Sequence, residues 1–305
     1  MRRLTVLFIA WIWLGVTGGT SAEPLQVTAT TSLLGSLLRE IGGSRVQVNV
    51  LIPPASCPGH FDLRPGDVAT IKRSRVLFAH QFERFIDRIG EVAGGDTVVH
   101  RIGVKGNWLV PATFLEAGER VTDILVRLDP NGAHEYRRNL QRLRQRARAV
   151  EDELRRSMRR AGVPGTPVAG SDMLEPLLRW MELKVVVSYG RAEDLTPAQW
   201  LNVVRSARQA GVRLVIDNLQ SGANTGVELA RDLNAQHVLL SNFPGGLPNT
   251  ASWEACLREN VRRVISAVGK VKRTKQKRWL RLPVNFAKCG CSTERHLHFA
   301  TYRFG

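Results

Sequence analysis

The chain has 305 residues, of which 43% are hydrophobic and 23% are charged, and its formal net charge is +17. This composition is typical of a folded globular protein and excludes collagen-like, coiled-coil and wholly disordered chains. Four cysteines in a chain of this length also exclude a small disulfide-stapled scaffold.

The positive charge is concentrated at the two ends of the chain. Residues 269–305 hold ten Lys and Arg against one Glu, and residues 1–22 hold two Arg and no acid, which leaves the body at 23–268 with a net charge of +6. A strong positive charge favours nucleic-acid or anionic-surface binding. Because the body carries little of it, we expect no nucleic-acid partner.

Residues 1–22 predict a signal peptide. Two arginines precede an apolar run from Leu4 to Val16, and the small residues Thr20 and Ala22 give the spacing that signal peptidase recognises, which predicts cleavage after Ala22. The run is shorter than the roughly 20 residues that span a bilayer, and an uncleaved anchor is the alternative. We therefore expect a soluble protein exported to the periplasm.

Strand-like runs alternate with amphipathic helical stretches in the first half of the body. In chain order, we expect strands at 25–29, 46–52, 76–79 and 97–102, and helices at 31–41, at 65–72 and from about 82. This alternation predicts a mostly parallel sheet with helices on both faces.

The longest helix is predicted after Asp129 and Pro130, an N-cap residue followed by one suited to the first turn. Its apolar residues recur every three or four positions until Gly162 and Pro164 end it. A helix of about 30 residues is roughly 45 Å long, more than one small domain needs. Beyond it we expect strands at 167–170, 185–187, 212–217 and 237–241 and helices at 197–209, 225–233 and 253–268.

The predicted fold class is therefore α/β, with two lobes of mostly parallel sheets flanked by helices and joined by one long backbone helix. We expect the lobes at 23–128 and 163–268, and the linking helix at 129–162.

Residues 269–305 lack helical or alternating periodicity, which predicts a basic tail without a defined fold. An arm for anionic surfaces or nucleic acid, a small metal site, and out-of-frame translation are the alternatives. The metal site would use four soft ligands within ten residues, in a spacing that differs from common zinc fingers: Cys289, Cys291, His296 and His298.

The sequence lacks the common local signatures of catalysis. It contains no G-x-S-x-G elbow, no P-loop, no dinucleotide fingerprint after a strand and no H-E-x-x-H. We therefore expect a binding protein that is not an enzyme and has no organic cofactor.

The loop at 52–67 presents His60, the candidate metal ligand. The loop follows a predicted strand, and the carboxyl ends of parallel strands are where α/β sheets bind ligands. A neutral imidazole there suits Zn²⁺ or Mn²⁺, although a lone His in a loop is more often an ordinary surface residue.

The segment IPPASCPGHFDLRPGD at 52–67 resembles the first ligand loop of the zinc- and manganese-binding periplasmic proteins of ABC importers, which reads PPG-x-x-PHxFEP-x-PxD. Further segments are similar to motifs of that family: VRLDPNGAHEYRRNL at 126–140, LLRWMELKVV at 177–186, TPAQW at 196–200 and RLVIDNLQ at 213–220. The resemblance covers about 25–268. It implies two α/β lobes joined by a rigid helix, with metal bound in the cleft between them.

The resemblance also implies a ligand set of three His and one acidic residue, of which His60 is the first. The second His, in a DPH-x-WLDP pattern, falls at Leu125, the third falls at Ser171, and the acidic ligand falls at Ser241 or Asn242. Leu cannot ligate, and neutral Ser and Asn oxygens are poor zinc ligands, so we expect a degenerate metal site.

Other side chains are candidates to complete that site: Cys57, His80, His134 and Asp217. Each also has an ordinary interpretation. Cys57 could be buried or paired with Cys256 in a disulfide, and His134 is expected on a solvated helix face.

The predicted function is that of the periplasmic substrate-binding protein of a zinc/manganese-type ABC importer, with a degenerate metal site. Zn²⁺ or Mn²⁺ is the expected transported ligand, an ABC permease in the inner membrane is the expected partner, and the protein is expected to be a monomer. Two alternatives stay open: the same fold binding a non-metal or chelated ligand, and an exported protein whose basic tail binds anionic surfaces.

Overall fold

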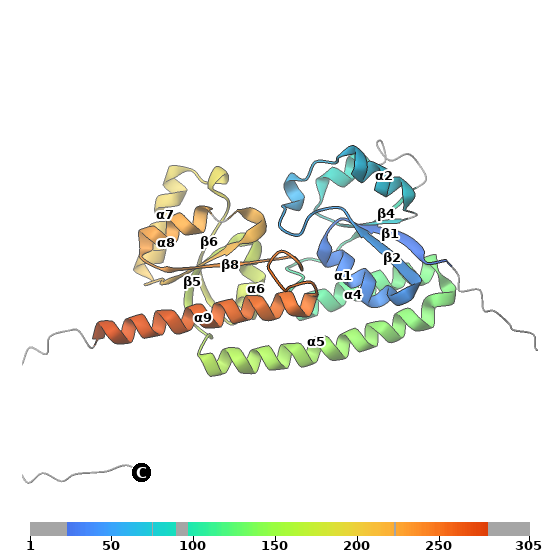
Figure 1. Ribbon diagram of the computed structural model, residues 1–305. Helices are drawn as coiled ribbons and strands as arrows, with labels where there is room; N and C mark the ends of the chain where they lie inside the picture. Colours follow the sequence, from blue (N-terminus) through green and yellow to red (C-terminus); the bar gives the residue numbers. More distant parts are fainter. Residues whose placement is uncertain (1–22, 75, 90–96, 223, 280–305) are drawn as a thin grey trace, which may run out of the picture.

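The computed structural model describes residues 23–74, 76–89, 97–222 and 224–279 (Figure 1). Its strands form two parallel four-stranded sheets, with strand orders β2-β1-β3-β4 and β6-β5-β7-β8. We call the halves built on these sheets the N-lobe and the C-lobe. The strands are β1 (Leu25–Ala29), β2 (Val46–Val50), β3 (Val76–His80), β4 (Val98–Ile102), β5 (Pro167–Ser171), β6 (Lys184–Tyr189), β7 (Leu214–Asn218) and β8 (Gln236–Leu240).

Helices flank both sheets, as the predicted α/β fold class requires, and that prediction is confirmed. The helices are α1 (Ser32–Gly42), α2 (Pro65–Arg73), α4 (Pro111–Leu128), α5 (Ala133–Ala161), α6 (Glu175–Trp180), α7 (Pro197–Gln209), α8 (Asn224–Leu233) and α9 (Trp253–Trp279).

The central strands are buried on both faces. In β3, Phe78 belongs to the core that includes α1, whereas Leu77 and Ala79 belong to a second core that includes α2. In β7, Ile216 belongs to the same core as Phe78, whereas Val215 belongs to another core that includes α7 and α8. This two-sided burial explains why both strands are continuous apolar runs in the sequence.

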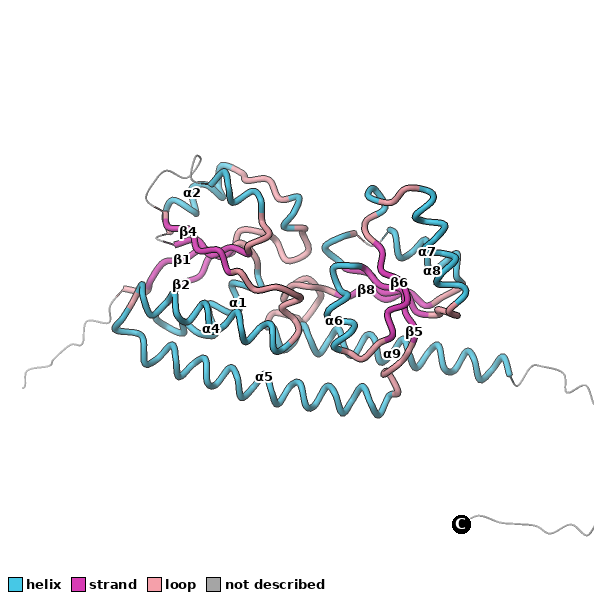
Figure 2. Tube along the Cα trace, turned by 180° about the vertical axis from the view of Figure 1, so that it is seen from behind, coloured by secondary structure: helices cyan, strands magenta, loops and turns pink. Residues whose placement is uncertain are grey.

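Helix α5 runs beneath both lobes, and α9 lies beside it (Figures 1 and 2). One face of α5 is buried over most of its 29 residues, from Tyr136 to Met158, and it packs against α1, α4 and α9. The same hydrophobic core contains Val27 of β1 and Leu214 of β7. The two lobes are therefore held by one continuous core.

The predicted end of the last helix at Val268 is wrong, because α9 continues to Trp279. Residues 269–279, predicted to lack a defined fold, are helical. Lys272 Nζ donates to the carbonyl oxygens of Ala161 and Gly162 at the end of α5, each at 3.0 Å. These carbonyls have no partner within their own helix, and a cation also suits the negative end of its dipole.

Two predicted segments lie outside the described residues: the signal peptide at 1–22, and the tail from 280 onward with Cys289, Cys291, His296 and His298. Among the residues that are described, none of the helices combines the length and apolar character needed to cross a bilayer.

Helix α4 is absent from the sequence-based prediction, although its signal is present. Pro111 stands in its first turn, and Phe114, Ala117, Val121 and Leu125 follow at spacings of three and four as buried residues. The helix matters for the site, because Leu125 belongs to it.

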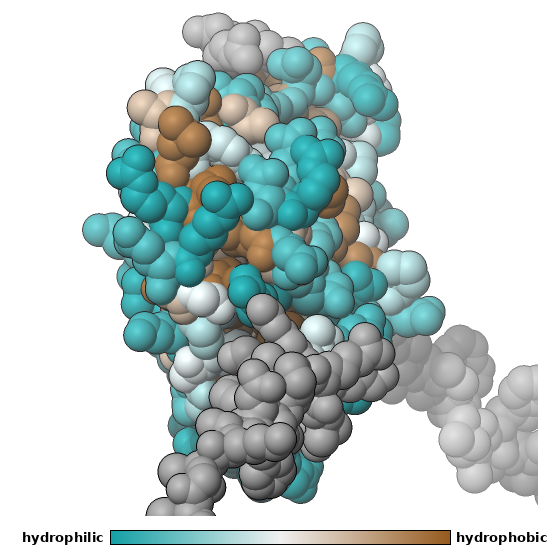
Figure 3. All heavy atoms as spheres, turned by 90° about the vertical axis from the view of Figure 1, so that its left-hand side faces the viewer, coloured by the Kyte–Doolittle hydropathy of each residue, from teal (hydrophilic) through white to brown (hydrophobic). Residues whose placement is uncertain are grey.

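Seen from the C-lobe end, apolar side chains reach the surface among hydrophilic ones (Figure 3). Among the exposed apolar residues of this lobe are Leu201 on α7 and Val227 on α8. Single exposed apolar side chains are normal on globular proteins. Leu201 therefore serves as a control for substitutions in the core.

Phe114→Ala should lower the free energy of unfolding by about 3–5 kcal/mol, which is typical for deletion of a buried ring. Phe114 is fully buried, and its ring stacks on that of Trp253 in α9, with centroids 4.6 Å apart. Urea unfolding followed by circular dichroism should show one transition, because the lobes share a core.

Leu201→Ala is the matched control and should change the free energy of unfolding by less than about 0.5 kcal/mol. Two separated transitions in the parent protein, or equal losses from both substitutions, would contradict a shared core.

Candidate functional site

The carboxyl ends of the two sheets face each other at the junction between the lobes. All strand pairs are parallel, so the loops after β1 to β4 leave one edge of the N-lobe, and those after β5 to β8 leave one edge of the C-lobe. The loops from the two edges meet between the sheets (Figures 1 and 2). This is the position at which α/β sheets bind ligands.

His60 lies in this junction, at the end of a short 3-10 turn (Pro58–His60) after β2, and its side chain is exposed. Its Nδ1 atom is 2.5 Å from Nη1 of Arg191, which follows β6 of the opposite lobe. A guanidinium can only donate, so Nδ1 must accept this hydrogen bond. The one imidazole expected to ligate metal is thus already bonded to a protein-borne cation.

Gln220, which follows β7, connects four loops of the junction. Its Nε2 donates to the carbonyl oxygen of Pro54 in the N-lobe at 2.7 Å and to Ser241 Oγ at 2.9 Å. Its Oε1 accepts from the backbone N–H of Asn242 at 3.0 Å, and its own carbonyl oxygen accepts from Arg191 at 3.3 Å. Both donors and the acceptor of this buried carboxamide are used within the protein.

Asn107 makes a second polar bridge between the lobes. It lies in the loop between β4 and α4, and its Nδ2 donates to Oδ1 of Asn242 at 2.7 Å and to the carbonyl oxygen of Met173 at 3.1 Å. Asn242, one of the two positions expected for the acidic ligand, therefore offers its side-chain oxygen to an amide of the opposite lobe. Asn107, Arg191 and Gln220 were all missed as functional residues by sequence reasoning.

The expected ligand position at Leu125 is wrong. Leu125 is 0% exposed in the last turn of α4, within the hydrophobic core. A better match to the WLDP part of the pattern is Trp108–Pro111, which opens α4 directly after the junction loop of β4. In that register the His position, two residues before the Trp, is Gly106.

Gly106 adopts φ +99°, a conformation that favours glycine and strains residues with a Cβ atom. A His would not fit this backbone without a change in the loop. In that register, the second ligand position has no imidazole, and its backbone conformation disfavours one.

The remaining expected positions are occupied by neutral groups. Ser171 ends β5, is 3% exposed, and has its Oγ 3.5 Å from Oδ1 of the neighbouring Asp172. Ser241 Oγ donates to the carbonyl oxygen of Phe243 at 2.9 Å. These hydroxyls are used within their own lobe.

The other candidate ligands are scattered. Cys57 and Cys256 are free thiols, so the disulfide alternative does not hold, and Cys256 is buried in the core. His134 is exposed on α5. Asp217 is buried in the C-lobe, where its carboxylate accepts from Tyr189 Oη at 2.8 Å and pairs with His237 Nε2 at 2.8 Å.

His80 is buried at the end of β3, beside the equally buried Glu83. Its Nε2 lies 2.9 Å from Thr31 Oγ1, and its ring packs edge-on against Trp108. The backbone N–H of His80 donates to Oε2 of Glu83 at 2.9 Å. Burial lowers the pKa of the His80 imidazole to about 3 and raises the pKa of the Glu83 carboxyl to about 7.

Across the part of the chain that the structure describes, no three side chains of His, Cys, Asp or Glu gather closely enough to hold a metal ion. A zinc site uses three or four such ligands, so the described residues do not form a preassembled zinc site.

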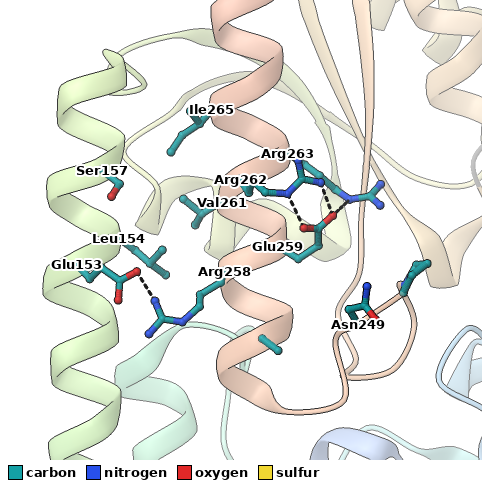
Figure 4. A pocket seen from close by; sticks show the side chains of 12 residues that line it. Glu153, Leu154, Ser157, Asn249, Arg258, Glu259, Val261, Arg262, Arg263 and Ile265 are labelled. Atoms are coloured by element: carbon teal, nitrogen blue, oxygen red, sulfur yellow. Dashed lines mark hydrogen bonds and ion pairs between the residues drawn. The ribbon is translucent and has the colours of Figure 1, made fainter.

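A groove of about 840 Å³ lies elsewhere, between α5 and α9 (Figure 4). Arg258 reaches across it from α9 to Glu153 on α5, and Glu259 is held by Arg262 and Arg263 of its own helix. Its charges are paired with each other, and it lies outside the sheet edges where α/β folds bind ligands. We do not place the cargo there.

Glu83→Gln should make the free energy of unfolding less sensitive to pH. The folded carboxyl has a pKa of about 7 against an ordinary value of 4.5, so the unfolded chain ionises first as pH rises. The parent protein therefore loses stability, relative to Glu83→Gln, on going from pH 4.5 to 7. The full difference is on the order of 3 kcal/mol.

Urea unfolding of both proteins at pH 5 and pH 8 measures this difference. The lowered pKa of His80 makes both proteins less stable as pH falls below 6.5. This loss is the same in both proteins, so it does not contribute to the difference between them. If the difference in free energy of unfolding between the two proteins were the same at pH 5 and at pH 8, this would contradict a buried, protonated Glu83.

The chain is similar to known proteins over most of its length. Residues 27–267 match the family described as zinc-uptake complex component A, periplasmic (ZnuA). A crystal structure of ZnuA has 17% sequence identity and a TM-score of 0.68, covering 81% of this chain and 100% of that one. A zinc-bound deletion mutant of ZnuA has 16% identity and a TM-score of 0.67, covering 80% and 98%.

A cadmium-bound periplasmic metal-binding protein from Candidatus Liberibacter asiaticus has 14% identity and a TM-score of 0.69, covering 80% of this chain and 99% of that one. At such identities the solved structures show the fold, whereas the family match shows the relationship. Members of this family are periplasmic binding proteins of transport systems and not enzymes. The chain belongs to the family of zinc-uptake complex component A, the periplasmic solute-binding proteins of metal-type ABC importers.

Proposed function

We propose that this protein is the solute-binding component of a zinc/manganese-type ABC importer, with a degenerate metal site at the junction. The observation that carries the proposal is the bond between His60 Nδ1 and Arg191, in a junction where Asn242, Ser171 and Gly106 occupy the other ligand positions. Zn²⁺ or Mn²⁺ is the proposed cargo, as in solved relatives that hold zinc or manganese.

The chemistry of the junction limits how tightly a bare ion can bind. Zn²⁺ prefers imidazole, thiolate and carboxylate ligands in a nearly complete shell. One imidazole with amide and hydroxyl oxygens leaves that shell incomplete. To ligate the metal, Oδ1 of Asn242 would have to give up its bond to Asn107, and Oγ of Ser241 its bond to Gln220.

The cellular context follows the family. The protein would be exported with 1–22 as a cleaved signal peptide, and it would deliver its cargo as a monomer to an ABC permease in the inner membrane. The proposed division is an N-terminal lobe at 23–128, a linking helix at 129–162 and a C-terminal lobe at 163–268. The helical segment 269–279 would extend α9 beyond that lobe.

A second candidate function is the binding of a chelated metal or another organic cargo in the same junction. The pair Asn107–Asn242 favours it, because carboxamides recognise polar organic groups by hydrogen bonding without requiring charge. Met173, 54% exposed after β5, adds an apolar surface beside this pair. Organic ligands are commonly held by apolar walls with a few placed polar groups.

Calorimetric titration of the exported, metal-stripped protein with Zn²⁺ and with Mn²⁺ tests the primary proposal. We expect a dissociation constant for Zn²⁺ weaker than roughly 10 µM, because the coordination shell is incomplete. His60→Ala should abolish the binding, since it removes the exposed imidazole of the junction, whereas His80 is buried.

His134→Ala is the control, because His134 is an exposed imidazole on α5 and should leave the titration unchanged. Nanomolar binding would contradict the degenerate site. Binding that survives His60→Ala would place the metal elsewhere. Complete absence of metal binding, with binding of an iron or zinc chelate instead, would favour the second candidate.

A further inference from the structure

We propose that Arg191 determines cargo specificity by keeping bare divalent cations away from His60. This inference rests on the proposed function, which puts a metal-type cargo at the junction. Arg191 comes from the C-lobe, His60 from the N-lobe, and the two side chains meet across the junction.

Several contacts hold Arg191 in place. Its side chain is 18% exposed, its Nη2 donates to the carbonyl oxygen of Gln220 at 3.3 Å, and its Nη1 lies 3.5 Å from Oε1 of Glu193. Gln220 is in turn fixed by its bonds to Pro54 and Ser241. The guanidinium is therefore part of the network that joins the lobes.

The bond to Arg191 determines which nitrogen of His60 carries a proton. Nδ1 accepts from the guanidinium, so its lone pair is occupied. In the neutral imidazole the proton is then on Nε2, which has no free lone pair either. In this arrangement neither nitrogen can ligate a metal until Arg191 leaves.

The charge of Arg191 acts in the same direction. A guanidinium stays protonated in proteins, so it cannot become neutral when a cation approaches. Zn²⁺ or Mn²⁺ at His60 would have to displace Arg191 or stand next to its positive charge, and both cost free energy. The guanidinium of Arg191 is thus an internal cation at the place that a metal ion would take.

Zinc affinity of the exported protein, measured by competition with a chromophoric chelator, tests this role. Arg191→Ala should bind Zn²⁺ about tenfold more tightly than the parent, or better, because a charged hydrogen bond on the ligand atom is gone. The double variant Arg191→Ala/His60→Ala should lose the gain. Arg205→Ala removes an equal charge from the exposed face of α7 and should change nothing.

Nitrogen-15 NMR of the imidazoles in metal-free protein gives a second readout, assigned with His60→Ala. The parent should show the Nε2–H tautomer of His60, and Arg191→Ala should show a mixture of tautomers. Unchanged His60 resonances in Arg191→Ala, or zinc affinity that stays the same or falls, would overturn the inference.

The two proposals fail in different ways. Absence of zinc binding in the parent contradicts the proposed function, whereas the inference depends on the change between parent and Arg191→Ala. Measurable binding that appears only in Arg191→Ala would support Arg191 as the excluding residue even then.

Discussion

Polar groups at the ends of the strands need hydrogen-bond partners, and this requirement governs the whole junction. The parallel sheets bring the loops of both lobes together at one place, where buried donors and acceptors left unpaired would cost free energy. At the contacts between the lobes, side chains of the protein supply these partners. Within the N-lobe, buried atoms of His80 and Glu83 at the end of β3 have none among the described residues. Gln220 donates to the carbonyl oxygen of Pro54 and accepts from the backbone N–H of Asn242. Asn107 of the N-lobe donates to Asn242 of the C-lobe, and Arg191 donates to Nδ1 of His60. A bare metal ion therefore has to displace Arg191 before Nδ1 of His60 can ligate it.

The rigid body of the molecule supports this arrangement. Helix α5 and the common core fix the lobes against each other, so the junction loops are held at hydrogen-bonding distance. A network that depends on bonds of 2.5–3.1 Å between lobes needs such a frame. Cargo exchange would then require rearrangement of side chains and loops, because the shared core resists a wide opening of the lobes.

Much of the fold could be predicted from the sequence, because its elements are strongly periodic. The apolar spacing of α5 and the continuous apolar strands β3 and β7 gave nearly correct bounds. The site was less predictable. His60 was found from its loop, but Leu125 was chosen by matching a Leu-Asp-Pro triplet that closes α4, while Trp108–Pro111 opens it. Arg191 lies in no motif, and Gln220 ends the RLVIDNLQ segment without a predicted role. Only the meeting of the two lobes gives these side chains a role.

The central claim is that the protein's own groups fill the place of the metal. Anomalous diffraction at the zinc edge, from crystals grown with one equivalent of Zn²⁺, tests it most directly. We expect Arg191 bonded to His60 Nδ1 and no anomalous peak of full occupancy in the junction. A full-occupancy peak about 2.0–2.1 Å from a nitrogen of His60, with Arg191 turned away, would contradict it.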